Sequence, residues 1–283
     1  FGLLGGTGFG LLGSALGCFA VLLCNPVMLI VSTGLFGCSM GIGFFIRFAA
    51  IEIVPKQWTE RAVTLVLLGG CIAAFVGPEA AEGTRGTFGE GHYLHMGVLV
   101  MTAFFNAANG AFISLVQFPV NVETRGGGSC QLLPNGEYRQ KAIDILRTRN
   151  FIVPMLVSTL SWIVIRLPSG VLRVAMHHLG YSSRQSILVI ELHFLGMYVP
   201  GCFSGRWIAR FGPRKVAMSG VFVYFIALIL LQLAGKAGPA DDVDSQVILW
   251  ALGMLLMGVG WNFTFSSGTV GSARLCAVCP EYK

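Results

Sequence analysis

The chain has 283 residues, of which 54% are hydrophobic and only 11% are charged. A soluble domain carries about 25% charged residues, so this composition excludes an ordinary soluble globular protein and indicates a polytopic membrane protein. The net charge is +6, but the cations lie between apolar segments instead of forming one patch, which argues against nucleic-acid binding.

Eight segments are apolar and long enough to cross a bilayer, which requires about 20 residues. In chain order they cover roughly 3–24, 26–50, 61–81, 93–117, 151–176, 185–204, 216–235 and 246–272. Asn25-Pro26 predicts a short turn after the first segment, and Arg166, Pro168 and Arg173 interrupt the fifth. The pattern predicts an all-α polytopic transmembrane helix bundle in the plasma membrane or an organelle membrane.

The connections between these segments alternate in charge. Those after the second, fourth and sixth segments carry mostly cations, such as Lys56, Arg139 and Arg206. The other connections carry mostly acids, such as Glu82 and Asp241. The positive-inside rule then makes the cation-rich connections cytoplasmic, so that the first helix runs from inside to outside.

The longest connection divides the chain in the middle. We expect four helices in residues 1–118, a cytoplasmic connecting loop in 119–150 and four helices in 151–283. Glycines at 126–128 make the first part of the loop flexible, and residues 137–149 resemble a basic amphipathic helix on the membrane face. Because the first residue is Phe1 and an apolar segment lies close to each end, we expect the chain to be a fragment of a longer protein.

The segment from Gly205 to Lys215 places four cations and two glycines between two apolar runs, and it predicts a tight turn between two membrane helices. It resembles the G-x-x-x-D-R-x-G-R-R loop that recurs between helices 8 and 9 of the major facilitator superfamily. Gly205, Arg210 and Gly212 match, whereas Ala209 replaces the acidic residue.

Two further stretches carry the same resemblance. Gly69-Gly70 with Gly77-Pro78 resembles the glycine-rich, Gly-Pro-ended fifth helix of many proton-linked exporters, which implies a role in helix packing. The segments 193–200 and 260–263 are similar to parts of bacterial-type permeases of this superfamily.

The resemblance covers essentially the whole chain and implies helices 3 to 10 of a bundle with two pseudo-repeated four-helix halves. It implies a conformational-switch role for six residues of the loop: Gly205, Arg206, Arg210, Gly212, Arg214 and Lys215.

Ionisable groups inside a spanning helix cost roughly 2.5–3.5 kcal/mol at its centre, so they are functional candidates. Arg47 lies near the cytoplasmic end of its helix, and Arg166 lies deep in the fifth. In the superfamily, helices 1, 4, 7 and 10 line the central cavity. Arg47 therefore either faces an anionic substrate, pairs with a carboxylate or extends its charged end to the membrane surface, and Arg166 either faces the cavity or extends in the same way.

Glu191 and His193 lie in the sixth segment, two residues apart, so that they point to different faces of the helix. Each either takes and releases a proton during transport or forms a structural hydrogen bond with a neighbouring helix. Trp261 and Asn262 lie in the last segment, where an amide beside an indole either holds a small organic molecule or packs against a neighbour.

The sequence predicts a secondary active transmembrane transporter, a permease that moves a small solute by alternating access, with protons as one candidate coupling ion. The competing hypothesis is a transporter-like membrane sensor or binding protein without transport activity. We expect no enzyme, because no cluster of His, Asp or Cys lies at one membrane depth. The expected partners are a small-molecule substrate and the lipid bilayer. We expect a monomer with no cofactor. We also expect no metal or redox site, because Cys276 and Cys279 form a lone C-x-x-C without a second pair or a nearby histidine.

Overall fold

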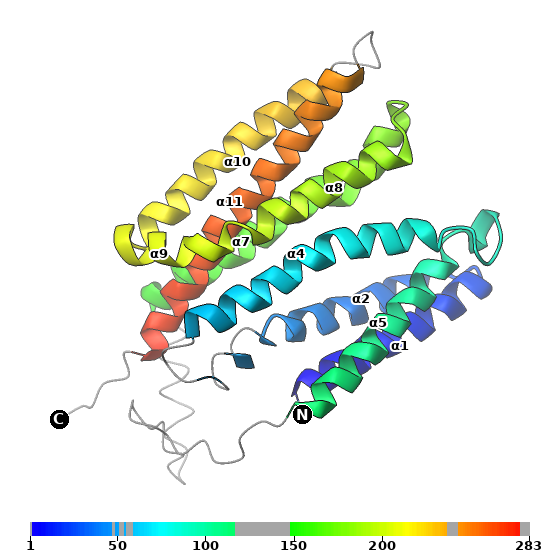
Figure 1. The fold of residues 1–283 in the computed structure, drawn as a ribbon, viewed down its shortest axis with the longest axis horizontal. Coiled ribbons are helices and arrows are strands. Elements are labelled where there is room, and N and C mark those ends of the chain that lie inside the picture. Colours follow the sequence, from blue (N-terminus) through cyan, green and yellow to red (C-terminus); the bar gives the residue numbers. More distant parts are fainter. Residues whose placement is uncertain are drawn as a thin grey trace. The chain divides into compact units, whose positions relative to one another are not determined.

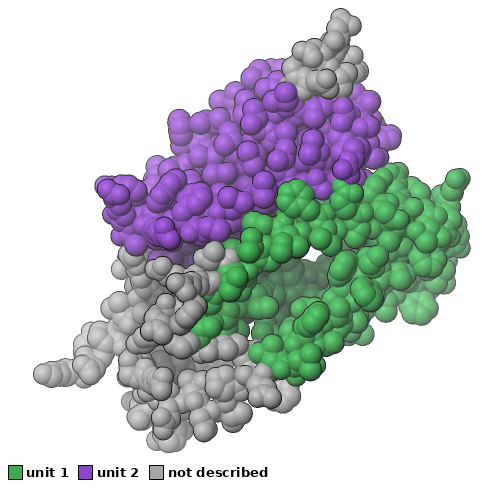
Figure 2. Space-filling view, viewed as in Figure 1, with its two compact units in different colours: residues 1–121 green, residues 122–283 purple. Residues whose placement is uncertain are grey.

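The computed structural model describes residues 2–46, 49–50, 54, 59–116, 148–236 and 243–277. The chain divides into two compact units, Phe1–Asn121 and Val122–Lys283 (Figure 2). Within the described residues the regular structure is helical, and eight stretches are long and apolar enough to cross a membrane. This confirms the predicted all-α polytopic bundle. The predicted amphipathic helix at 137–149 lies almost entirely outside the described residues.

The first unit is built around its first helix. Its elements are α1 (Gly2–Leu22), α2 (Pro26–Gly43), α4 (Thr59–Gly83), the short 3-10 helix η2 (Gly91–Tyr93) and α5 (Met96–Leu115). The helix α1 packs against both α2 and α5 (Figure 1). Two boundaries differ from the prediction. The second helix ends at Gly43, before a turn, and the fourth begins with η2 before α5 proper.

The turn between α1 and α2 follows from Asn25-Pro26. The Asn25 side-chain oxygen accepts hydrogen bonds from the backbone N–H groups of Val27 at 3.0 Å and Met28 at 3.3 Å. These bonds satisfy donors that have no partner within the helix. Pro26 then occupies the first turn, where its missing N–H costs nothing. A short helical hairpin results.

Small residues allow α1 to approach its neighbours closely. Gly6, Gly10, Gly13 and Gly17 are all buried. A methyl group added at Gly10 would meet the side chain of Asn106 in α5. The hydroxyl of Ser32 in α2, which is fully buried, donates a 2.7 Å hydrogen bond to the Gly13 carbonyl. Such spacing lets helices pack in lipid without a hydrophobic driving force between them.

The second unit contains α7 (Arg149–His178), α8 (Ser183–Tyr198), α9 (Gly201–Phe211), α10 (Pro213–Lys236) and α11 (Val243–Ala277). The residues that interrupt the apolar pattern of the fifth segment do not interrupt the helix, since α7 runs continuously through Pro154 and Pro168. The helix α8 begins at a capping box in which the Ser182 and Gln185 side chains each accept a hydrogen bond from the other's backbone.

The centre of this unit is α11, which packs against α7, α8 and α10 (Figure 1). At two crossings the contact is between backbones. A methyl group at Gly196 in α8 would overlap the Leu255 carbonyl of α11, and one at Gly258 would overlap the His193 carbonyl. Only glycine fits at these positions, because any side chain would push the two helices apart.

The predicted turn from Gly205 to Lys215 is wrong over most of its length. The helix α9 continues to Phe211 and α10 starts at Pro213, so that only Gly212 breaks the helix, with φ +85°. Glycine adopts this left-handed conformation at no steric cost. The charged residues do not end the helix because Ile208, which is 2% exposed, packs with Val216 and Phe263 and holds α9 against the unit.

Candidate functional site

The candidate pathway residues that the structure describes gather on α7, α8 and α11 of the second unit. His193 of α8 is the most sharply defined. Its side chain is 2% exposed, and its Nδ1 lies 2.9 Å from the Met254 carbonyl oxygen of α11. Because a carbonyl oxygen can only accept, Nδ1 carries the proton and donates it. The hydrogen bond fixes the orientation of the ring, and Nε2 is the nitrogen that can gain or lose a proton.

Glu191 lies two residues before His193 on α8 and is also buried, with 6% of its surface exposed. The structure thus keeps two titratable side chains within the bundle, both on α8. They remain candidates for proton transfer.

Asn262 of α11 connects two helices. Its side-chain N–H donates a 2.7 Å hydrogen bond to the Met197 carbonyl of α8. The Asn262 Oδ1 atom is buried and has no hydrogen-bond partner among the described residues. The amide therefore has a structural contact on one side and an unused acceptor on the other.

Trp261 belongs to an aromatic cluster that we define as Trp162, Trp261 and Phe265, contributed by α7 and α11. The Trp261 and Phe265 rings stack with centroids 4.8 Å apart and planes 10° apart, and Trp162 meets Trp261 edge-on at 4.9 Å. The Trp261 Nε1–H is buried and has no acceptor among the described residues, although a buried indole N–H usually has one.

Arg166 lies at the edge of the aromatic cluster. Its guanidinium carbon is 5.5 Å from the centroid of the Trp162 ring, within the range of a cation–π contact. The side chain is exposed on the surface of the unit, and it interacts electrostatically with His193. The geometry brings a cation, three aromatic rings and a histidine into one neighbourhood.

Sequence reasoning singled out Arg166 and Trp261 but missed Trp162 and Phe265. Their signal was present, because Trp162 precedes Arg166 by four residues and Phe265 follows Trp261 by four. Residues at that spacing lie on the same helix face.

The predicted switch residues lie at the junction of α9 and α10. Arg206, Arg210, Arg214 and Lys215 all have exposed side chains, and the Arg210 guanidinium lies over the Phe211 ring at 5.4 Å. Gly212 forms the turn itself, while Gly205 lies inside α9 with open space beside it. The switch role stays a prediction.

The remaining candidates are not brought to this neighbourhood. Arg47 lies outside the described residues. Gly69, Gly70, Gly77 and Pro78 lie in α4, and a methyl group added at Gly69 or Gly77 would meet no described atom within 4 Å. Their role in helix packing stays a prediction.

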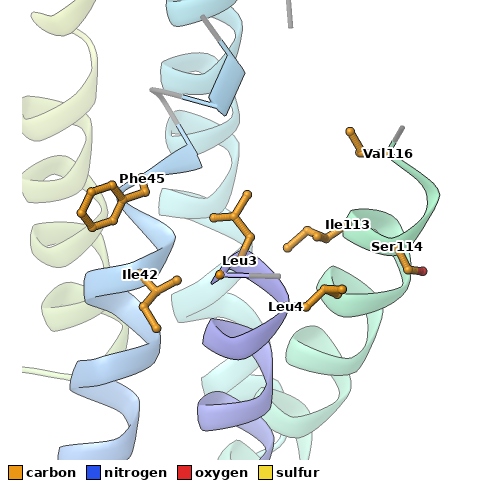
Figure 3. Close-up of a pocket in the computed structure, with 8 residues that line it drawn as sticks. Leu3, Leu4, Ile42, Phe45, Ile113, Ser114 and Val116 are labelled. Carbon is orange, nitrogen blue, oxygen red and sulfur yellow. The ribbon is translucent and has the colours of Figure 1, made fainter. Parts of the chain in front are cut away.

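The first unit contains a pocket of about 600 Å³ where α1 begins and α2 and α5 end (Figure 3). Its lining is apolar apart from one side chain, Ser114, whose hydroxyl already donates to the Ala111 carbonyl at 2.7 Å. The eight lining residues are Gly2, Leu3, Leu4, Ile42, Phe45, Ile113, Ser114 and Val116. None of the eight side chains is charged or titrates near neutral pH.

Comparison with known proteins identifies relatives among membrane transporters. The riboflavin transporter RfnT of Brucella anthropi is 28% identical over 79% of this chain and 51% of its own length. The uncharacterized MFS-type transporters YddS and YdeG of Bacillus subtilis are 27% and 26% identical, over 95% and 90% of this chain and 61% and 58% of their own. The chain thus spans about half to three-fifths of the length of these relatives. No family model and no solved structure matches it.

These relatives, together with the eight apolar helices, support membership of the major facilitator superfamily and show an integral, multi-pass membrane protein.

Proposed function

We propose that this chain forms the core of a secondary transporter that moves a small solute by alternating access and couples that movement to protons. The main evidence for this proposal is that Glu191 and His193 are both buried in α8. Titratable groups within spanning helices are costly and typical of proton relays. The names of the relatives, all transporters, support the same function.

Proton transfer would use the free nitrogen of His193. Since Nδ1–H is held by the Met254 carbonyl, protonation at Nε2 produces an imidazolium inside the unit, within electrostatic range of Arg166. A charge appearing there changes the balance of interactions between α7, α8 and α11. This is the kind of local change that biases one bundle conformation over another.

The solute would bind near the aromatic cluster. Trp162, Trp261 and Phe265 offer ring faces and edges, and Arg166 offers a cation with several N–H donors. A planar conjugated solute with hydrogen-bond acceptors fits this chemistry. One relative is named a riboflavin transporter, so riboflavin is the first solute to test.

The test is uptake by the full-length protein in proteoliposomes, with riboflavin and then a panel of small organic solutes, with and without a pH gradient. We expect gradient-dependent flux that Glu191→Gln or His193→Ala abolishes. Glu79→Gln and His178→Ala, which change the same residue types at exposed positions, are the matched controls and should retain flux.

A further variant separates proton transfer from structure. His193→Gln keeps a donor for the Met254 carbonyl but does not titrate, so flux should lose its response to the gradient while the protein stays folded. Flux that ignores the gradient in the unmodified protein would overturn proton coupling. Folded protein with no flux for any solute would overturn the transport proposal and favour a sensor.

A further inference from the structure

The junction of α9 and α10 combines the cations of the predicted switch with exposed aromatic residues, which the switch role does not explain. We call it the α9–α10 corner and define it by four cations and two aromatic residues: Arg206, Trp207, Arg210, Phe211, Arg214 and Lys215. All six side chains are exposed, with Trp207 at 42% and Phe211 at 51%. Two large aromatic side chains and four charges thus share one exposed corner of a membrane protein.

The corner has a fixed shape. On the inner side of α9, Ser204 and Ile208 are both 2% exposed, and Ile208 packs with Val216 of α10. Trp207 is held between two rings, with centroids 5.1 Å from Phe203 and 5.4 Å from Phe263. The helix therefore presents its aromatic and basic side chains in a defined arrangement.

Helix length places the corner at the level of the lipid headgroups. The apolar stretch Ser183–Phe211 has 29 residues and comprises α8 and α9, which a turn at Val199 and Pro200 separates. At 1.5 Å per residue, this amounts to about 44 Å of helix. The hydrocarbon core of a bilayer is only about 30 Å thick. The two helices together are longer than the core requires, so α9 at the end of the stretch lies toward the headgroup region, where tryptophan and arginine are favoured.

Among the described residues, the charges of the corner have no ion-pair partner. The segment from Gly201 to Val216 contains no acidic residue. Clusters of at least four Lys or Arg residues beside a membrane helix attract anionic lipids. The charge and the depth of the corner both favour a lipid headgroup over a soluble partner.

We propose that the α9–α10 corner binds the headgroups of anionic phospholipids, with the cations contacting phosphate and Trp207 and Phe211 lying among the upper acyl chains. This inference is independent of the solute and of proton coupling. It predicts that anionic lipid concentrates at this corner.

The experiment is fluorescence quenching of the full-length protein in nanodiscs by lipids with brominated chains. The signal of Trp207 is the emission that the Trp207→Phe variant lacks. We expect brominated phosphatidylglycerol to quench this signal at lower mole fractions than brominated phosphatidylcholine. Arg206→Gln/Arg210→Gln should reduce the preference by roughly fivefold per charge removed.

The matched control is Arg184→Gln/Lys236→Gln, which removes two exposed cations outside the corner and should leave the preference unchanged. Arg206→Lys/Arg210→Lys should retain it, and high salt should weaken it in the unmodified protein. Equal quenching by the two lipids would overturn the proposal, as would an unchanged preference in the folded Gln variant. Equal quenching would instead fit cations covered by another part of the protein.

Discussion

The two units assemble their helices around different kinds of contact. In the first unit, the glycines of α1 face mainly side chains, such as Ile42 beside Gly6 and Asn106 beside Gly10. In the second unit, the glycines between α8 and α11 face backbone atoms. Side chains can rotate away from an added group, whereas a helix backbone cannot. The second unit should therefore be the stiffer frame.

The buried polar groups follow the same division. Those described in the first unit are hydroxyls, namely Thr7, Ser14 and Ser32. The second unit buries Glu191, His193 and Asn262 as well. A titratable group works only if its partner stays in place, as Met254 does for His193. The second unit thus combines stiff helix packing with the buried candidate residues. We infer that the stiff packing keeps these residues and their partners in place.

The largest expected effect tests that stiffness. Gly196→Ala places a methyl group on the Leu255 carbonyl, and we expect the free energy of unfolding to fall by about 3 kcal/mol. Denaturant titration of the full-length protein in mixed micelles measures it. Gly170→Ala in α7, where the added group meets nothing, is the control. Equal values for the two variants would show that the α8–α11 contact is not rigid.

A smaller effect is expected in the first unit. Gly10→Ala displaces the side chain of Asn106, which donates a 2.9 Å hydrogen bond to the Thr102 carbonyl. Because that side chain can rotate, we expect a loss of only about 1 kcal/mol. The same titration measures it, with Gly8→Ala at an open position as the control. A loss as large as that of Gly196→Ala would remove the distinction between the units.

The smallest effect concerns hydrogen bonds between helices, which should contribute alike in both units. Ser32→Ala removes the bond to the Gly13 carbonyl, and Asn262→Ala removes the bond to Met197. Each should lower the free energy of unfolding by about 0.6 kcal/mol. Ser114→Ala, whose hydroxyl bonds only within its own helix, should have almost no effect. A clearly larger value for Asn262 would extend the difference between the units to their polar contacts.

The sequence predicts the helices well because a spanning segment must be apolar along its whole length. It fails at α9, where the run of charged residues predicts a turn but the structure has a helix. Arginine is a good helix former, and Ile208 anchors the segment from its buried side, so the helix continues until Gly212.

The candidate site was predictable only residue by residue. The ionisable side chains stand out against an apolar background, as Glu191 does. The contact between Trp162 and Trp261 joins residues about a hundred positions apart, and no local pattern contains it. The same is true of the bond from His193 to Met254, which depends on how closely α8 and α11 approach.

The backbone contact between α8 and α11 also has an evolutionary consequence. At positions 196 and 258 selection acts on the absence of a side chain, so that every replacement weakens the bundle, however conservative its chemistry. Position 170 has no such restriction and is free to drift. Among distant homologues, the lineage should retain glycine at the first two positions even where the solute, and the residues that bind it, have diverged.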